Sequence, residues 1–328
     1  MSASETRAPA NPHARHAKLT SRAALASVAV ALLLLSFKGY AAWATDSVAM
    51  LGSLADTALD FAASLVTLFG VRFAAMPADR NHRFGHGKAE ALVALFQVVL
   101  IIVASIGIAL RAIERIGSGA TTANAEYGIG VSLIAIAATF ALLAYQRHVI
   151  RQTESVAIGT DHLHYQSDLF LNLSVIIALA LDQYFGFSGA DALFGIGIAL
   201  WLAWNALRAS SRAVDQLMDK EWPLERRQRF IETAGHHPRI SGIHDLRTRT
   251  SGMHDFAQFH IWVSPQMTVR EAHRVMDEIE TRLHREFPGV EILIHPDPEG
   301  HVDSQSDPLR SKDAAVLIEQ EQEAEQGE

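Results

Sequence analysis

Four residues with metal-binding side chains interrupt two otherwise apolar segments: Asp56 and Asp60 in the first, His164 and Asp168 in the second. Each pair is four residues apart, so in a helix its two side chains lie on one face. Asp60 lies 12 residues before Arg72. His164 lies 13 residues after Arg151. At ~1.5 Å of rise per residue both are ~18 to 20 Å from a basic flank, which predicts that the two pairs meet at one depth.

Carboxylates at that depth in a membrane need a compensating charge. One Asp at the centre of a spanning helix costs on the order of 2.5 to 3.5 kcal/mol, so three without a partner would cost about 10 kcal/mol. A dication would compensate them, and three carboxylates with one imidazole suit tetrahedral zinc better than octahedral magnesium. The alternatives are interhelical hydrogen bonding or a water-filled pore without metal. The two matched pairs favour the metal site, with zinc first and cadmium, cobalt and ferrous iron as further candidates.

The same ligands predict an energy source for transport. Metal binding requires a neutral imidazole and ionised carboxylates, so protons and metal compete for the site. We therefore expect proton exchange through alternating access around a site near the membrane midplane.

Two neighbouring charges need an interpretation. Asp161 lies on the face of His164, nearer the basic flank. A helix N-terminal charge is the favoured interpretation, and a guide for incoming metal is the alternative. Lys38 lies in the outer third of the first apolar segment, where we expect it to extend its ammonium to the membrane surface.

The elements that must position these residues are transmembrane helices. The chain has 328 residues, 49% of them hydrophobic, and no cysteine, which excludes disulfides and thiolate metal sites. Six segments approach the roughly 20 residues that span a bilayer, at about 22–43, 48–71, 89–113, 126–145, 155–181 and 190–207. Lys and Arg precede the first, third and fifth segments and follow the second, fourth and sixth. This distribution predicts that both termini are cytoplasmic, although Arg111 and Arg115 count against it.

The rest of the chain is more polar and has shorter predicted elements. Residues 1–20 are expected to be an N-terminal cytoplasmic segment, and 21–214 the six-helix bundle. Residues 215–302 predict a soluble α+β domain, with helices at about 224–235 and 268–286 and strands at about 243–250, 254–263 and 290–295. Residues 303–328 are acidic and poor in apolar residues, so we expect a disordered tail. The basic residues are scattered along the chain, which argues against nucleic-acid binding.

Four motifs give the sequence a family resemblance. They are Leu54-Ala-Asp-Thr-Ala-Leu-Asp60, Asn81-His-Arg-Phe-Gly-His-Gly-Lys-Ala-Glu90, His162-Leu-His-Tyr-Gln-Ser-Asp168 and His244-Asp-Leu-Arg-Thr-Arg249. With them the chain, over about residues 18 to 300, resembles the cation diffusion facilitators, in particular the bacterial zinc and ferrous-iron efflux branch. The resemblance implies a homodimer in the bacterial inner membrane, six spans per protomer, a cytoplasmic αββαβ domain of metallochaperone type, and metal/proton antiport. It places the transport site on the same four residues, Asp56, Asp60, His164 and Asp168.

The resemblance also implies two peripheral metal sites. Asp79, His82 and His86 have i, i+3, i+7 spacing between the second and third spans. The residues alone favour a solvated basic loop there, whereas the resemblance favours a weak metal site. In the soluble domain it implies a binuclear zinc site formed by His244, His260, His273, His295 and Asp297. The remaining histidines of the domain and tail are interpreted as surface residues: His236, His237, His254, His284 and His301.

These features bear on three classes of function. A membrane-bound metal sensor needs no charged site in mid-membrane and would carry a signalling or DNA-binding module. An intramembrane metalloenzyme would be expected to show a motif such as HExxH or a nucleophile elbow, which the sequence does not contain. A secondary transporter, not an enzyme, accounts for the matched ligands together with a cytoplasmic metal domain.

Overall fold

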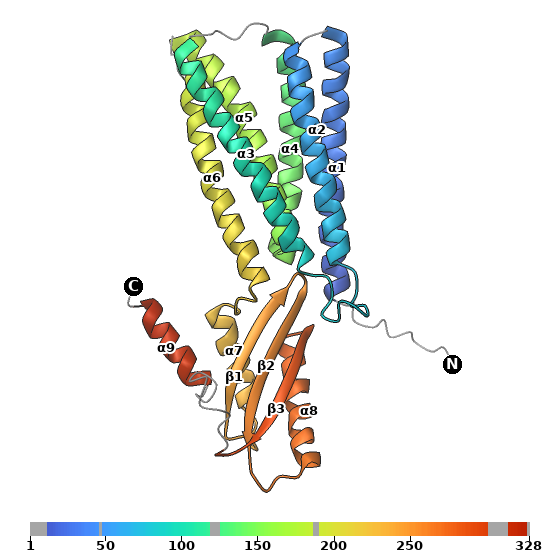
Figure 1. The fold of residues 1–328 in the computed structure, drawn as a ribbon, viewed down its shortest axis with the longest axis vertical. Coiled ribbons are helices and arrows are strands. Elements are labelled where there is room, and N and C mark those ends of the chain that lie inside the picture. The colour runs from blue at the N-terminus through green and yellow to red at the C-terminus, as the bar shows by residue number, and fades with distance from the viewer. Residues whose placement is uncertain (1–11, 46–47, 119–124, 186–189, 301–313, 327–328) are drawn as a thin grey trace, which may run out of the picture. The chain divides into compact units, whose positions relative to one another are not determined.

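The computed structural model describes residues 12–45, 48–118, 125–185, 190–300 and 314–326. They fall into two compact units, one of residues 15–215 and one of the residues from 216 onward, to which residues 12–14 are also assigned. The first unit consists of six long helices (Figure 1): α1 Pro12–Thr45, α2 Val48–Ala74, α3 Ala89–Ser118, α4 Ala125–Thr153, α5 Val156–Phe185 and α6 Ala190–Leu217. Each contains one of the six predicted spans. Within the described residues, four stretches are long and apolar enough to cross a membrane, namely Ala14–Tyr40, Asp56–Ala74, Ala89–Glu114 and Ala192–Leu217.

One boundary differs from the sequence prediction. Helix α1 begins at Pro12, so residues 12–20 of the predicted N-terminal segment are helical and continue directly into the first predicted span. The side chain of Thr20 is fully buried, and its hydroxyl donates to the carbonyl of His16 one turn earlier. The polar start of the chain therefore continues the helix beyond its apolar part.

Small and apolar residues hold the helices together. One cluster of Ala23, Leu68, Val149 and Ile158 joins α1, α2, α4 and α5, and a second joins α3, α5 and α6. Helices α2 and α3 approach so closely at Gly70 that a Cβ placed there would lie 2.1 Å from Cγ2 of Val93. Small residues thus allow close approach of α2 and α3, while larger side chains such as Tyr165, Ile158 and Leu202 fill the interior.

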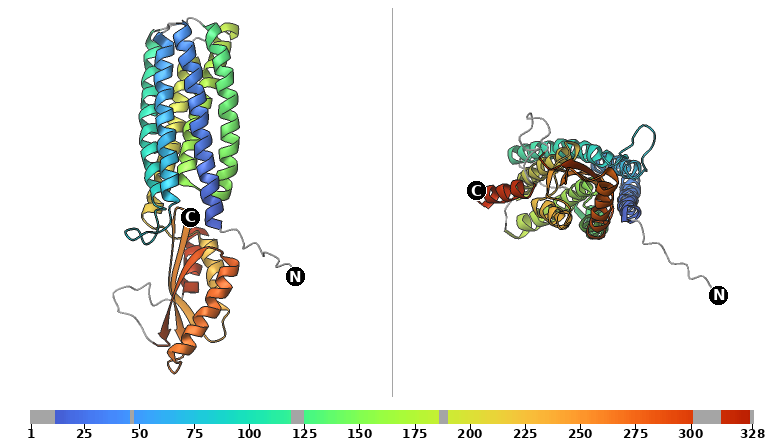
Figure 2. Two further views of the ribbon diagram at one scale, coloured as in Figure 1. Left: turned by 90° about the vertical axis from the view of Figure 1, so that its right-hand side faces the viewer. Right: turned by 90° about the horizontal axis from the view of Figure 1, so that it is seen from below.

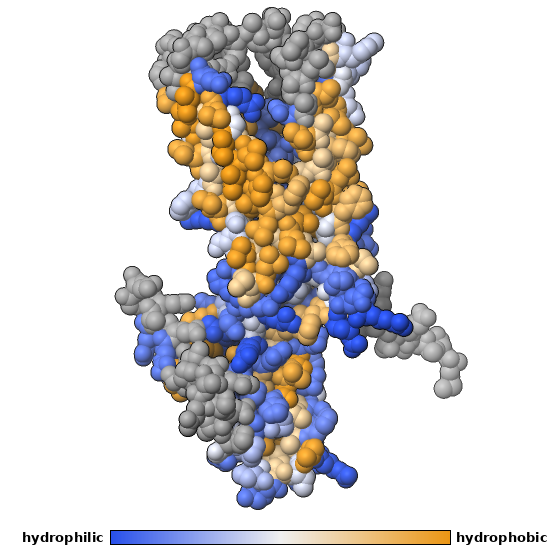
Figure 3. Space-filling view, viewed as in Figure 1, coloured by the Kyte–Doolittle hydropathy of each residue, from blue (hydrophilic) through white to orange (hydrophobic). Residues whose placement is uncertain are grey.

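Large apolar side chains cover the outside of this unit. Leu32, Phe69, Val103 and Leu200 are each at least half exposed, and Figure 3 shows an apolar surface over most of the helices. A surface of this size and kind is what a helical bundle presents to lipid.

The second unit has the predicted αββαβ order: α7 Leu224–Gly235, β1 Gly242–Ser251, β2 His254–Val263, α8 Val269–Glu286 and β3 Val290–Pro298. Strand β2 lies in the middle of the sheet, antiparallel to β1 and parallel to β3. Ala257, Phe259 and Ile261 alternate along β2 and are buried against α7 and α8, as the period of a strand requires. Figure 2 shows the helices on one side of the sheet. The other face carries the alternate residues, including His260 and Trp262.

Helix α8 shows why this unit folds as it does. Its apolar residues Ala272, Val275, Ile279 and Leu283 recur at helical spacing and are all buried. At its start, Thr268 and Glu271 form a capping box, in which each side chain accepts from the other's backbone N–H. The carboxylate of Glu271 accepts from the backbone N–H and from the hydroxyl of Thr268, and these two hydrogen bonds lower its pKa.

The acidic tail is not disordered throughout. Residues 314–326 form a further helix, α9 (Ala314–Gln326), which packs on α7 and β1. Ala314 and Ile318 are buried in the core of the unit, and Gln322 donates a hydrogen bond to Gln228 of α7 at 2.6 Å. The prediction of disorder was wrong for these residues. Ala314, Ile318 and Gln322 are four residues apart and share one helical face, and their contacts are enough to hold a short helix against the unit. Residues 301–313 and 327–328 lie outside the described part.

Candidate functional site

Three of the four predicted transport ligands lie together inside the helical unit. Nε2 of His164 is 3.0 Å from Oδ1 of Asp60 and 3.9 Å from Oδ2 of Asp168. One ligand atom from each of the three residues lies within 4.8 Å of the other two. All three side chains are partly exposed, His164 least at 16%. This is the spacing of a preformed cation site with one nitrogen and several oxygen ligands.

Asp56, the fourth predicted ligand, lies apart from this group. It lines the same cavity of about 200 Å³ as Asp60 and Asp168, one turn nearer the start of α2. Ala31, Leu34 and Lys38 line the cavity along α1, so it extends from the three ligands toward the C-terminal end of that helix. Figure 3 shows hydrophilic residues in a hollow between the apolar surfaces of the helical unit. The structure therefore places Asp56 on the wall of the cavity that also contains Asp60 and Asp168.

Lys38 does not extend to the membrane surface as predicted. Its ammonium donates a hydrogen bond to Oγ1 of Thr57 at 2.7 Å, and its side chain lines the cavity that contains the carboxylates. A carboxylate-lined cavity is a better environment for an ammonium than the hydrocarbon beside it. A direct part of Lys38 in transport had no support from the sequence, because the apolar run around it gives no sign of the side chain's direction; its place on the cavity wall makes it a functional candidate.

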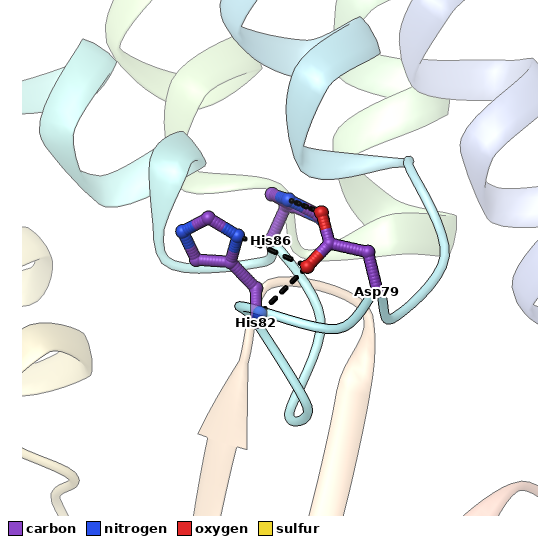
Figure 4. Close-up of side chains that lie close together, drawn as sticks. All are labelled: Asp79, His82 and His86. Atoms are coloured by element: carbon purple, nitrogen blue, oxygen red, sulfur yellow. Dashed lines mark hydrogen bonds and ion pairs between the residues drawn. The ribbon is translucent and has the colours of Figure 1, made fainter.

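The loop between α2 and α3 brings Asp79, His82 and His86 together (Figure 4). Oδ1 of Asp79 accepts from the backbone N–H groups of Asn81 and His82, and lies 3.3 Å from Nδ1 of His82. Oδ2 of Asp79 lies 3.4 Å from Nε2 of His86. The hydrogen bond from the His82 backbone is the main cause that lowers the pKa of Asp79, which keeps it ionised.

His86 is the ordered member of this loop cluster. It is buried, and its ring stands edge-on to Phe73 at 4.8 Å. Its Nδ1 has no hydrogen-bond partner in the described residues. A solvated loop with chance histidines would not bury one of them with an unsatisfied nitrogen, so the geometry fits a metal ligand better.

The histidines of the second unit form a row across its sheet. In the strand register His244 is opposite His260, and His260 is opposite His295. Asp297 lies at the centre: its Oδ2 is 3.1 Å from Nε2 of His244 and 2.8 Å from Nδ1 of His260, and its Oδ1 is 3.3 Å from Nε2 of His295. Four of the five predicted ligands are therefore in contact on the open face of the sheet.

The charges of this cluster suit a cation. Burial and the nearby His260 lower the pKa of His244, so its imidazole is neutral at neutral pH. Burial alone would raise the pKa of Asp297, but the hydrogen bond and charge of His260 and the charges of the other histidines lower it. A neutral imidazole beside an ionised carboxylate is the protonation state that metal binding requires. Nδ1 of His244 is buried without a hydrogen-bond partner in the described residues.

His273, the fifth predicted ligand, does not reach this cluster within one chain. It lies on α8, with its side chain 68% exposed and Nδ1 3.2 Å from Asp277. Asp245 takes a place in the cluster that the sequence did not predict. It lies at an irregularity of β1 with a φ of 48°, and its Oδ2 is 3.6 Å from Nε2 of His260. Bulges of this kind redirect a side chain and cannot be inferred from strand periodicity.

The remaining histidines were predicted to be surface residues, and the structure contradicts this for one of them. His237 was predicted to lie on the surface but is buried, with Nε2 2.9 Å from Glu278 of α8. The hydrogen bond from His237 lowers the pKa of Glu278. His284 is exposed and 3.3 Å from Glu280, in agreement with a surface residue, and His301 lies outside the described residues.

Comparison with known families matches both units. The family described as the cation efflux transmembrane domain matches residues 24–218, which include the cavity and all six helices except the first turns of α1. The family described as the cytoplasmic domain of cation efflux proteins matches residues 222–299. The second match places the C-terminal end of α6 on the cytoplasmic side, so the cavity lies toward the opposite, outer side of the three ligands.

Individual relatives agree with these matches. The cation-efflux pump FieF of Yersinia pestis (strain Pestoides F) is 43% identical over 284 residues, which is 87% of this chain and 94% of the relative. FieF of Escherichia fergusonii is 42% identical over 283 residues, 86% of this chain and 94% of the relative. Among solved structures, the Zn form of CzrB is 36% identical and covers 26% of this chain and 99% of its own, with a TM-score of 0.23.

Proposed function

This chain belongs to the cation diffusion facilitator family of cation efflux transporters, and we propose that it exports Zn²⁺ from the cytoplasm in exchange for protons. The observation that carries the proposal is the group formed by Asp60, His164 and Asp168. It lies inside the helical unit, at the inner end of a cavity, and within the cation efflux match. Such a position suits a transported ion better than a structural one, because a structural site is enclosed by its ligands.

Zinc is the ion that this donor set favours. An imidazole with carboxylate oxygens can enclose a tetrahedral ion, whereas Mg²⁺ requires near-octahedral oxygen coordination and retains water. Cd²⁺, Co²⁺ and Fe²⁺ accept similar ligands and are secondary candidates for transport. Asp56 can complete the coordination if α2 moves by a small amount, since it is one turn from Asp60 on the same cavity wall.

Proton coupling follows from the chemistry of the ligands. Every atom that binds the metal can instead bind a proton, so loading with one releases the other. Alternating access then permits metal to load from the cytoplasmic side and protons to load from the outer side. Because both use the same atoms, the transporter is not able to carry them in the same direction at once.

The cytoplasmic unit is proposed to bind zinc and to dimerise. His244, His260, His295 and Asp297 are in contact, and His273 is on another element. A site that uses all five residues therefore needs a second copy of the chain, which makes metal binding a stabiliser of a homodimer. The loop group of Asp79, His82 and His86 is proposed as a further metal site. By similarity to the bacterial relatives, the protein is proposed to reside in the inner membrane.

Zinc uptake into inside-out proteoliposomes with an imposed pH gradient tests this function. The wild-type protein is expected to accumulate Zn²⁺ only when the lumen is acidic, and to export protons as it does so. Asp60→Ala and His164→Ala are expected to reduce uptake by more than the ~10- to 100-fold that loss of an outer-shell partner costs. Uptake that is independent of the gradient would contradict proton exchange.

Ser174→Ala is a matched control for this assay. Ser174 is also a buried polar residue of α5, but its hydroxyl donates to the carbonyl of Leu171 within the same helix. It is expected to retain uptake. If His164→Ala and Ser174→Ala behave alike, the site assignment is wrong.

A further inference from the structure

Asp161 is the centre of a buried hydrogen-bond network on the cytoplasmic side of the metal site. It was interpreted above as a helix N-terminal charge, but it lies within α5, one turn before His164, and is fully buried. Its Oδ2 accepts from the hydroxyl of Ser27 at 2.6 Å and from Nε2 of Gln146 at 2.8 Å. Its Oδ1 accepts from Nε2 of Gln97 at 3.2 Å.

The partners of Asp161 come from different helices. Ser27 belongs to α1, Gln97 to α3 and Gln146 to α4, and each is almost fully buried. Gln97 also donates to Oγ1 of Thr67 on α2, and Gln146 donates to Ser27. One carboxylate therefore connects α5, directly or through one intermediate, to four other helices at a single level.

The interior of the helical unit is packed differently on the two sides of the Asp161 network. On the outer side, the cavity reaches the transport ligands along Lys38 and Ala135. On the cytoplasmic side, Ala24, Leu68 and Ile158 belong to a cluster of buried residues that fills the space between α1, α2, α4 and α5. The structure is thus open toward the outer side and packed toward the cytoplasm, and the Asp161 network lies at the boundary.

We propose that Asp161 is a gating residue, the hub of a latch that keeps the cytoplasmic end of the bundle closed while the metal site faces outward. The proposal rests on the alternating access proposed above. To open the cytoplasmic side, α5 must separate from at least one of α1, α3 and α4, so the carboxylate must give up a hydrogen bond to a neutral donor. A buried carboxylate holds such donors strongly, because nothing in a dry interior replaces them. The strength of the latch then sets the ratio of the two states.

Asp161→Asn is the sharpest perturbation of the latch. The two carboxylate oxygens accept three hydrogen bonds, and an amide replaces one oxygen by a donor. With the amide nitrogen in the Oδ1 position it faces Nε2 of Gln97, and in the Oδ2 position it faces Nε2 of Gln146. Either orientation sets two donors against each other, with almost no change in volume.

The absence of cysteine from the chain permits a direct readout of the state. Ala135→Cys, on the cavity wall of α4, reports access from the outer side. Ala157→Cys, fully buried one turn nearer the cytoplasm than Asp161 on α5, reports access from the inner side. Each is labelled with a membrane-impermeant maleimide in sealed vesicles of the matching orientation, without metal.

The expected result is a shift in opposite directions. With Asp161 intact, position 135 is labelled and position 157 is protected. Asp161→Asn is expected to raise the labelling rate at 157 by about tenfold and to lower the rate at 135, as loss of one hydrogen bond to a charged group would. Because no metal or proton gradient is involved, this result is independent of whether the exported ion is zinc or the exchange uses protons.

Two further variants keep the test decisive. Thr160→Val alters the neighbouring buried hydroxyl, which donates to the carbonyl of Val156 in its own helix, and is expected to leave both rates unchanged. Gln146→Leu removes one donor to Asp161 and is expected to shift the rates as Asp161→Asn does; it supplies the test if the Asn variant does not accumulate. Unchanged rates in both latch variants, or a rise at both reporters, would overturn the proposal, the second because it indicates general loosening.

Discussion

Nε2 of His164 and Oδ1 of Asp60 lie 3.0 Å apart on two different helices, although 104 residues separate them in the chain. This contact directly joins the two halves of the proposed transport site. A dication that binds here must replace this hydrogen bond and its proton. It requires only small movements of the ligand side chains. A preformed site of this kind lowers the free-energy cost of arranging the ligands, so more of the metal–ligand interaction contributes to affinity.

Lys38 is expected to weaken metal binding from the outer side. Its ammonium and a dication would share the cavity with the same carboxylates and would repel each other. Lys38→Met should therefore tighten Zn²⁺ binding by about tenfold, which lies within the usual range of coupling free energies between two ligands. Lys38→Arg keeps the charge and is the matched control. Zinc titration of the purified full-length protein, followed by calorimetry, measures both. Equal affinity in the Met and Arg variants would show that the charge at this position does not act on the metal.

Asp297 is expected to be the most sensitive residue of the cytoplasmic cluster, because it contacts three histidines. In the wild type, zinc at 100 times its Kd should stabilise this unit by ~2.7 kcal/mol. Asp297→Asn should remove that gain as seen by thermal unfolding with and without zinc.

His284→Ala is the matched control for Asp297→Asn. His284 lies on the same unit but is exposed and paired with Glu280, so its loss should leave the zinc-dependent rise in Tm intact. A rise that persists in Asp297→Asn would mean that zinc binds this unit elsewhere.

Helix α9 is expected to contribute to the stability of the cytoplasmic unit. Ile318 is 4% exposed in the core, whereas Val316 on the same helix is 46% exposed. Ile318→Ala should lower the free energy of unfolding by about 2 kcal/mol, at the low end for a buried Ile because α9 lies at the edge of the core. Val316→Ala should change it by less than about 0.5 kcal/mol. Chemical denaturation followed by tryptophan fluorescence separates the two, and equal effects would contradict the packing of α9.

The contact of Gly70 with α3 gives a prediction in which two effects oppose each other. In a helix, Ala is more stable than Gly by roughly 0.5–1 kcal/mol. At Gly70 the added Cβ would lie 2.1 Å from Val93, and overpacking costs typically about 1–3 kcal/mol. Gly70→Ala should therefore destabilise the protein, and adding Val93→Ala should restore it.

Gly197 of α6 provides the control for Gly70, because a Cβ there meets nothing within 4 Å. Gly197→Ala should be neutral or slightly stabilising in detergent-solubilised protein heated in a thermal-shift assay. If Gly70→Ala is as stable as Gly197→Ala, the close approach of α2 and α3 is not present in solution.

The sequence predicted the elements well where periodicity decides them. Strand β2 alternates buried and more open residues from Ala257 to Val263, and α8 repeats buried residues at helical spacing, so the positions of these two elements follow from the pattern. Helix α9 was missed because its composition is polar and only a few of its residues enter the core. Composition reports how much surface a segment can bury on average, and not whether a neighbouring surface has room for it.

For the candidate site, the sequence could predict which residues share one face of a helix. Spacing and depth brought Asp60, His164 and Asp168 together, but the direction of Lys38, the bulge that presents Asp245 and the network of Asp161 depend on contacts between distant segments. Gln97 and Gln146 alone give no signal, since a single amide in an apolar helix is common. Only the three-dimensional arrangement shows that both amides donate to one carboxylate.

Zinc X-ray absorption on the full-length protein tests the central claim most directly. The peripheral sites are first removed by Asp79→Ala and Asp297→Ala, which leaves the group of Asp60, His164 and Asp168. One bound Zn²⁺ is predicted, with four nitrogen and oxygen ligands at about 2.0–2.2 Å and the scattering of a single imidazole, which disappears in His164→Ala. Six oxygen ligands without imidazole, or a spectrum unchanged by His164→Ala, would contradict the account.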